Sequence, residues 1–265
     1  MTNQWTLNRL NFEGCWQGRG CWHVRDSEGD LNFATPTRVI TPTRYAISFS
    51  DEDTGVWDGS GLFFAPDGKA TYAISRDSYN AGGGCWQFAG AGGQSSRRLD
   101  AGASRFGHEI NLFQARSRSM LVLIWEPIDH HWRLQVVGAV GFRCLQGQSV
   151  EPERPICASP EALLEPLRGW QGSSERLTPS EAIQGQPSAP QPVVFDPEQL
   201  LRHDCSAVMA DGLVFSVPEQ LPNAAFRLEI GGLLGPALFQ QVSVLFDSAG
   251  TLTAWQRSTF QATRI

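Results

Sequence analysis

The chain has 265 residues, of which 41% are hydrophobic and 18% are charged, and its formal net charge is -6. A chain of this length can bury a substantial core without disulfides or metals, and its acidic balance argues against nucleic acid as a partner. No stretch reaches the ~18 uninterrupted apolar residues that a membrane-spanning helix needs, so no membrane span is expected. The chain is rich in Gly, Trp and Phe and poor in Lys, which favours an all-β fold with many turns.

Residues 1–11 have neither the basic start nor the apolar run of a secretory signal, so we expect the protein to be cytoplasmic. In that compartment cysteines are ordinarily reduced, and no two of them here have Cys-x-x-Cys spacing. We therefore expect free thiols, no metal site and no cofactor. The six cysteines are Cys15, Cys21, Cys85, Cys144, Cys157 and Cys205.

A short helix is expected over 2–11, followed by the first strand. Successive side chains of a strand alternate between its two faces, and one face of this strand carries only indoles and glycines. These residues are Trp16, Gly18, Gly20 and Trp22. Because the glycines leave space between two large rings, we expect this face to line a ligand cavity. The alternative is that the indoles simply pack into the floor of a barrel.

A later strand, beginning near Arg105, has one apolar and one polar face. Glu109 and Asn111 share the polar face, and the apolar face is made of Phe106, His108, Ile110 and Leu112. The apolar face is predicted to lie across the cavity from the two indoles. Leu121 to Trp125 is apolar on both faces, as expected of a strand beneath a second layer.

Two kinds of polar residue are candidates for chemistry. His108 sits on an otherwise apolar face, where an imidazole can transfer a proton or hydrogen-bond a ligand, but a satisfied core or rim histidine is the alternative. It is the single, weak candidate for a catalytic residue. Arg116 and Arg118 share a strand face and can hold a carboxylate or propionate, unless that face is simply solvated.

The segment 145–158 is rich in Gln, Glu and Pro and marks a boundary between two domains, 1–150 and 151–265. After this boundary Ser159 is expected to cap a short helix that leads to Trp170, and Asp196 to cap another helical turn. The rest of the second domain is predicted to be strands.

The start and the end of the first domain recur in the second. Gly14-Cys15-Trp16-Gln17-Gly18 returns as Gly169-Trp170-Gln171-Gly172, and each half ends in a hairpin that closes near an arginine, Arg143 or Arg264. An antiparallel barrel places its first and last strands side by side. We therefore predict that Trp16 lies close to Arg143, and Trp170 close to Arg264, where each barrel closes.

A Gly-x-Trp on the first strand with an arginine on the last strand resembles the lipocalin and calycin signature. The doubled form resembles a cyanobacterial family of two-barrel, lipocalin-like proteins of unknown function, and more distantly the lipocalin-like bilin lyases. The resemblance implies two consecutive antiparallel lipocalin-like β-barrels that arose by internal duplication, the second one shorter. Trp16 with Arg143 and Trp170 with Arg264 would be their structural closures.

The resemblance implies binding of an apolar or conjugated small molecule, such as a tetrapyrrole, carotenoid, isoprenoid or fatty acid, by a carrier or chaperone. The residues place this ligand in the first barrel, between the Trp16 and Trp22 face and the apolar strand face that includes His108. One alternative is an enzyme acting on such a ligand, as a bilin-type lyase, a hydratase, or a cyclase or isomerase. The other is a scaffold with filled barrels. Similarity to bilin lyases also implies a pigment-binding protein as partner, and the oligomeric state is left open.

Overall fold

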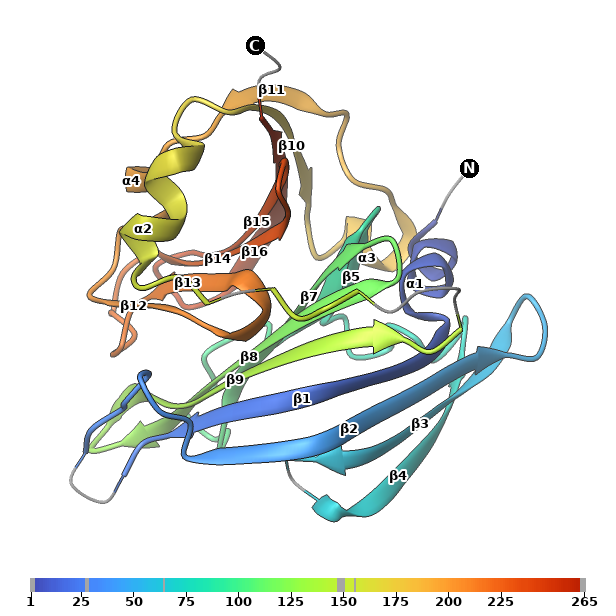
Figure 1. Cartoon of the computed structure of the whole chain (residues 1–265). Helices are drawn as coiled ribbons and strands as arrows, with labels where there is room; N and C mark the ends of the chain where they lie inside the picture. Colours follow the sequence, from blue (N-terminus) through green and yellow to red (C-terminus); the bar gives the residue numbers. More distant parts are fainter. Residues whose placement is uncertain (1–2, 27–28, 64, 147–150, 155, 263–265) are drawn as a thin grey trace.

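The computed structural model describes residues 3–26, 29–63, 65–146, 151–154 and 156–262. In this part of the chain, strands predominate and form two antiparallel sheets, one from each half of the sequence (Figure 1). The prediction of an all-β fold built from two consecutive antiparallel sheets is therefore confirmed. None of the described helices is both long and apolar enough to cross a membrane.

The first sheet is curled and has the order β4-β3-β2-β1-β9-β8-β7-β6-β5. Its strands are β1 (Gly14–Val24), β2 (Arg38–Phe49), β3 (Thr54–Leu62), β4 (Ala65–Ser75), β5 (Cys85–Phe88), β6 (Ala91–Ser95), β7 (Phe106–Gln114), β8 (Ser117–Ile128) and β9 (His131–Cys144). The first strand β1 pairs with the last strand β9, as predicted for a closing sheet. The edges β4 and β5 face each other across the open side.

Helix α1 (Gln4–Phe12) bridges the two sides of this opening. It begins at Asn3, whose side chain caps the helix by accepting a hydrogen bond from the backbone N–H of Thr6. On one side the Trp5 indole donates to the carbonyl of Glu52, between β2 and β3, at 2.6 Å. On the other side the side chain of Asn11 donates to Gln87 Oε1 on β5 at 2.8 Å. The helix therefore links the β2–β3 turn on one side of the opening to the edge strand β5 on the other.

The second sheet has the order β11-β10-β16-β15-β14-β13-β12. Its strands are β10 (Gln171–Leu177), β11 (Gln191–Val194), β12 (Cys205–Val208), β13 (Leu213–Val217), β14 (Phe226–Gly235), β15 (Leu238–Phe246) and β16 (Leu252–Gln261). The short helices of this half are α2 (Pro160–Leu164), η1 (Glu165–Leu167), α3 (Glu181–Gln184), α4 (Pro197–Leu200) and η2 (Ala210–Gly212). Ser159 caps α2 and Asp196 caps α4, as the sequence predicted.

Apolar side chains from the short helices fill the inner face of the second sheet. Leu163, Leu164 and Leu167 from α2 and η1 lie in one buried cluster with Phe239 and Phe260 from the sheet. Figure 1 shows α2 and α4 lying along this side of the second half. The interior of the second half is thus packed by the chain's own helices.

The outer face of the first sheet packs against the opposite face of the second sheet in one continuous core. At its centre the indoles of Trp86 and Trp255, one from each half, lie 6.0 Å apart and donate hydrogen bonds to the same Ser95 hydroxyl, at 3.2 and 3.0 Å. Leu121 and Leu123 belong to this core, so β8 does lie beneath a second layer. The division into domains 1–150 and 151–265 stays a prediction, because the halves share this core.

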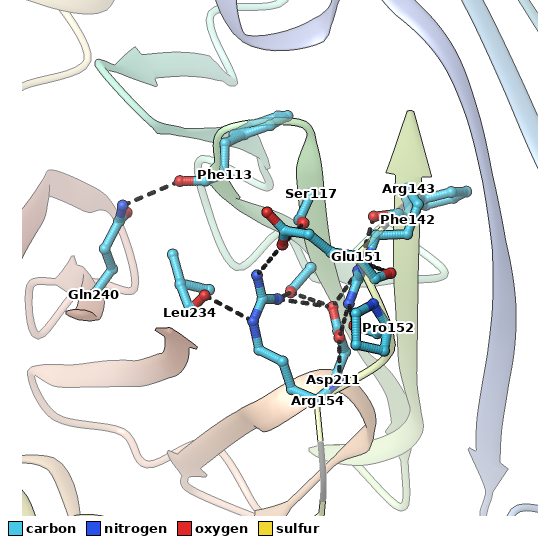
Figure 2. Close-up of polar contacts among 11 residues, drawn as sticks. Phe113, Ser117, Phe142, Arg143, Glu151, Pro152, Arg154, Asp211, Leu234 and Gln240 are labelled. Carbon is cyan, nitrogen blue, oxygen red and sulfur yellow. Dashed lines mark hydrogen bonds and ion pairs between the residues drawn. The ribbon is translucent and has the colours of Figure 1, made fainter. Parts of the chain in front are cut away.

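A buried carboxylate joins the two halves at the edge of this core. Asp211, in η2, accepts hydrogen bonds from the Arg143 guanidinium at 2.6 and 3.0 Å, from the Arg154 guanidinium at 3.1 Å and from the Ser119 hydroxyl at 2.6 Å. Figure 2 shows Asp211 between the two arginine side chains. Burial by itself raises the pKa of Asp211, but the hydrogen bonds from Arg143, Ser119 and Arg154 outweigh it and hold that pKa below its usual value.

Arg143 lies on the strand that pairs with β1, but its side chain does not lie over the Trp16 ring. In the β1–β9 ladder Trp16 is opposite Cys144, and Gln17 is opposite Arg143. The side chains of Trp16 and Arg143 therefore point to opposite faces of the sheet. The cation that lies over the Trp16 ring is Arg116, at 5.2 Å from the ring centroid. In the second half Trp170 packs with the helix-filled core, while Arg264 lies outside the described residues.

We expect Asp211→Asn to lower the free energy of unfolding by about 3 kcal/mol or more, because it leaves two largely buried guanidinium groups without a counter-charge. Urea unfolding followed by circular dichroism measures this. The matched control is Asp58→Asn, an exposed aspartate on β3 that bonds Thr71, which should change the free energy by about 0.5 kcal/mol or less. Equal effects of the two substitutions would show that the junction does not stabilise the fold.

Candidate functional site

A cavity of about 500 Å³ lies inside the curled first sheet, along the opening between β4 and β5. Strands β2 to β4 form one wall, β5 to β8 form the other, and α1 contributes Asn8 and Phe12. The volume is within the range of small-molecule sites in proteins. The lining residues on which its chemistry depends are Tyr45, Trp57, Tyr72, Tyr79, Glu109 and Arg118.

An aromatic ladder crosses the first wall. The rings of Tyr45 and Trp57 are 5.0 Å apart, and those of Trp57 and Tyr72 are 5.3 Å apart, so the three rings connect β2, β3 and β4 in sequence. Gly59 makes room for the central ring, since a Cβ there would lie 2.4 Å from the Trp57 indole. The ladder runs from the buried part of the cavity to its mouth, where Tyr72 is 59% exposed.

Arg118, on β8, is the charged group at the inner end of this ladder, and its side chain is 1% exposed. Its guanidinium lies 4.8 to 5.9 Å from the ring centroids of Phe12, Tyr45, Phe113 and Phe142. Burial lowers the pKa of Arg118, and the nearby Glu109 carboxylate opposes that shift. An arginine nevertheless stays charged in proteins, so the cavity holds a cation surrounded by aromatic rings.

Two polar side chains of β7 contact this cation incompletely. Arg118 Nε donates to Asn111 Oδ1 at 2.7 Å, whereas Nη2 is 3.4 Å from Glu109 Oε1. The third nitrogen, Nη1, is buried and has no hydrogen-bond partner among the described residues. A buried donor without a partner is uncommon in folded proteins, because desolvation is costly unless a hydrogen bond replaces the lost water.

Burial keeps three other ionisable groups of the lining neutral at physiological pH. Burial raises the pKa values of Tyr45 and Tyr79 well above the ordinary phenol range, and it raises the pKa of the Cys85 thiol to about 11. Among the described lining residues, the charged side chains are therefore Arg118 and Glu109. The arrangement is suited to binding an apolar body with a polar or anionic end, and it presents no activated nucleophile.

The structure does not bring together the two faces that were predicted to enclose a ligand. Trp16 and Trp22 belong to the core on the inner face of the first sheet, with Phe113 and Val140. The apolar face of β7 instead packs in the core between the two sheets. Its members are Phe106, Ile110 and Leu112, together with His108, whose ring contacts Phe106 in that core. The two faces predicted to enclose the ligand therefore lie on opposite sides of one sheet.

The space expected beside Gly18 and Gly20 is already occupied. A Cβ on Gly18 would lie 2.5 Å from the carbonyl oxygen of Gly141, and one on Gly20 would lie 2.8 Å from the Trp22 indole nitrogen. The glycines thus permit close packing with β9 and with the Trp22 ring. Bulky substitutions at either position would disturb the fold before they tested ligand binding.

His108 is enclosed by the rings of Phe106, Trp125 and Phe246, with centroids 4.7 to 6.1 Å from its own. Neither ring nitrogen has a hydrogen-bond partner among the described residues. Burial lowers the pKa of His108 to about 3, so the imidazole is neutral in the fold. It lies in the core between the halves and does not line the cavity.

The cavity residues gave weaker signals in the sequence. Arg118 was recognised as a residue able to hold a carboxylate, and Glu109 as part of a polar strand face. Neither pattern predicted that the polar face of β7 lies on the concave side of the first sheet. The ladder of Tyr45, Trp57 and Tyr72 was missed because its members lie on three separate strands and become neighbours only through pairing.

Comparison with known proteins adds information on the fold. No family model matches the sequence, and no curated protein matches it. The structure is similar to that of a protein of unknown function from the DUF3598 family of Nostoc punctiforme, with a TM-score of 0.72 and 16% identity over 99% of this chain and 100% of that one. At this identity the similarity shows a shared fold alone.

A tesB protein of Mycobacterium avium subspecies paratuberculosis aligns at 13% identity over 82% of this chain and 96% of that one. Its TM-score is 0.15, which supports no argument about fold or function.

We expect His108 to make the fold sensitive to mild acid. Its pKa is lower in the fold than in the unfolded chain, so stability is complete above about pH 6.5 and falls as the pH drops toward 3, by about 1.4 kcal/mol per unit. Between pH 7.5 and pH 5, wild type should therefore lose about 2 kcal/mol more than His108→Leu in urea unfolding. His131→Leu, on an exposed hairpin, is the control and should keep the wild-type loss. An identical loss in His108→Leu would contradict a neutral, buried His108.

Proposed function

We propose that this protein binds an apolar or conjugated small molecule inside the first sheet, as a lipocalin-like carrier or chaperone. The observation that carries the proposal is the cavity of about 500 Å³ between β4 and β5, with an aromatic ladder along one wall. A tetrapyrrole, carotenoid, isoprenoid or fatty acid has the extended apolar or conjugated body that such a wall contacts well.

The shape of the opening supports an elongated ligand. Tyr45 lies at the buried end of the ladder and contacts Arg118, whereas Tyr72, at the other end, is largely exposed. A flat or extended molecule laid along the three rings would pass from the interior to the solvent. Its inner part would be surrounded by protein, and its outer part would stay accessible for transfer.

Two further observations favour binding over the alternatives. His108, on which the catalytic alternative rested, is neutral and enclosed in the core between the sheets. The interior of the second half is filled by its own helices, which supports a scaffolding role for that half. We assign ligand binding to the first half and support of the cavity wall to the second.

The remaining parts of the proposal rest on the sequence and on the resemblance. The resemblance to bilin lyases supports a pigment-binding protein as recipient of the ligand. All six cysteines are free thiols in the structure, in keeping with a reducing compartment.

Retinol, an uncharged conjugated isoprenoid, is a suitable probe. The purified full-length protein should bind it saturably with one site, as measured by quenching of tryptophan fluorescence and by native mass spectrometry. Gln94→Trp should weaken this binding about 10-fold or more, because residue 94 lines the cavity at its exposed end and a new indole would occupy part of it.

Gln191→Trp is the matched control, since Gln191 is also exposed but lies on β11 in the second half. It should leave retinol binding unchanged. The proposal would have to be abandoned if retinol does not bind, or if both tryptophan variants bind it as wild type does.

A further inference from the structure

A carrier of purely apolar ligands does not require the buried Arg118 guanidinium at the inner end of the cavity. A purely apolar ligand would gain nothing from a guanidinium that is 1% exposed, and burying a charge is unfavourable unless the charge is paired. The surrounding rings offset part of that cost through cation–π contact. They do not supply hydrogen-bond acceptors in the plane of the guanidinium, where its N–H groups point.

The protein's own groups leave the guanidinium incompletely paired. Glu109 is 3.4 Å from Nη2, its side chain is 40% exposed, and it also accepts a hydrogen bond from Asn111 at 3.0 Å. Nη1 has no partner among the described residues. Arg143 is a useful contrast, because its guanidinium forms two short bonds to Asp211. Incomplete pairing is therefore not a property of every buried arginine in the chain, and at Arg118 the unpaired donor belongs to a residue that lines the cavity.

We infer that the natural ligand carries a carboxylate, and that Arg118 holds it at the inner end of the aromatic ladder. The inference rests on the proposed function and names the class of ligand: a monocarboxylic acid with an extended apolar or conjugated body. A planar guanidinium pairs well with a carboxylate, and the free N–H groups of Nη1 supply donors that no described residue uses. The body of the ligand then lies along Tyr45, Trp57 and Tyr72 toward the mouth.

Glu109 should act against binding of a ligand carboxylate, whereas Arg118 should favour it. A ligand carboxylate at Arg118 comes close to the Glu109 carboxylate and is repelled by it. Removal of the Glu109 charge should strengthen binding of an acid, whereas removal of the Arg118 charge should weaken it. Both changes should alter the affinity for an acid more strongly than the affinity for an uncharged ligand of the same shape.

Retinoic acid and retinol test this, because they share a ring and polyene and differ in having a carboxylate or an alcohol at the end. At pH 7.5 the wild-type protein should bind retinoate about 10- to 100-fold more tightly than retinol, the range expected for hydrogen bonds to a charged group. Arg118→Met should abolish this preference by lowering the affinity for retinoate. Glu109→Gln should increase the preference.

Arg116→Met is the matched control, since Arg116 is on the adjacent turn, lies over Trp16 and does not line the cavity. It should keep the wild-type preference. Circular dichroism and urea unfolding show whether Arg118→Met is folded, and the wild-type and Glu109→Gln measurements stand without it.

The outcomes separate the two proposals. If wild type binds retinol and retinoate equally, or if Glu109→Gln leaves the ratio unchanged, the carboxylate inference is overturned and the binding function stands. If neither compound binds to the wild-type protein, the proposed function fails and the inference falls with it.

Discussion

Burial of one face of the first sheet against the second sheet is the constraint on which the rest of the structure depends. Trp86, Leu121 and Trp125 from the first half and Phe215 and Trp255 from the second lie in this common core with no measurable exposure. Burial of such large apolar side chains is the main favourable contribution to folding. Because the most apolar face of β5 to β9 turns toward the second half, the less apolar face becomes the concave side, which holds the cavity.

The two halves share the pairing of their first and last long strands but differ in what covers the concave side of the sheet. In each, the first long strand pairs with the last one, β1 with β9 and β10 with β16. The first half leaves its concave side partly open beneath α1, whereas the second half fills that side with leucines from α2 and η1. A filled half presents a rigid surface, and the open half is the one that can take up a ligand.

Buried arginines mark both the junction and the cavity, and they differ in how completely they are paired. At the junction the Asp211 carboxylate pairs with the guanidinium groups of Arg143 and Arg154, at 2.6 and 3.1 Å, and so joins the two halves. In the cavity Arg118 keeps one nitrogen unpaired amid aromatic rings. The carboxylate at the junction comes from the protein, whereas in the cavity we propose that it comes from the ligand. This difference separates a structural ion pair from a candidate binding group.

The sequence by itself determined the strand-rich fold, the pairing of first and last strands, the caps at Ser159 and Asp196, and which side chains share a face. These follow from alternation, turn residues and capping, which act over a few neighbouring residues. Only the tertiary structure decided which face of β7 is internal, because that depends on what covers the sheet. It also decided that Arg116 rather than Arg143 lies over Trp16, since the register of β1 on β9 puts Arg143 on the opposite face of the sheet from Trp16. The ring ladder and the charge at its end exist only once β2, β3, β4 and β8 enclose one cavity, and no local pattern records that enclosure.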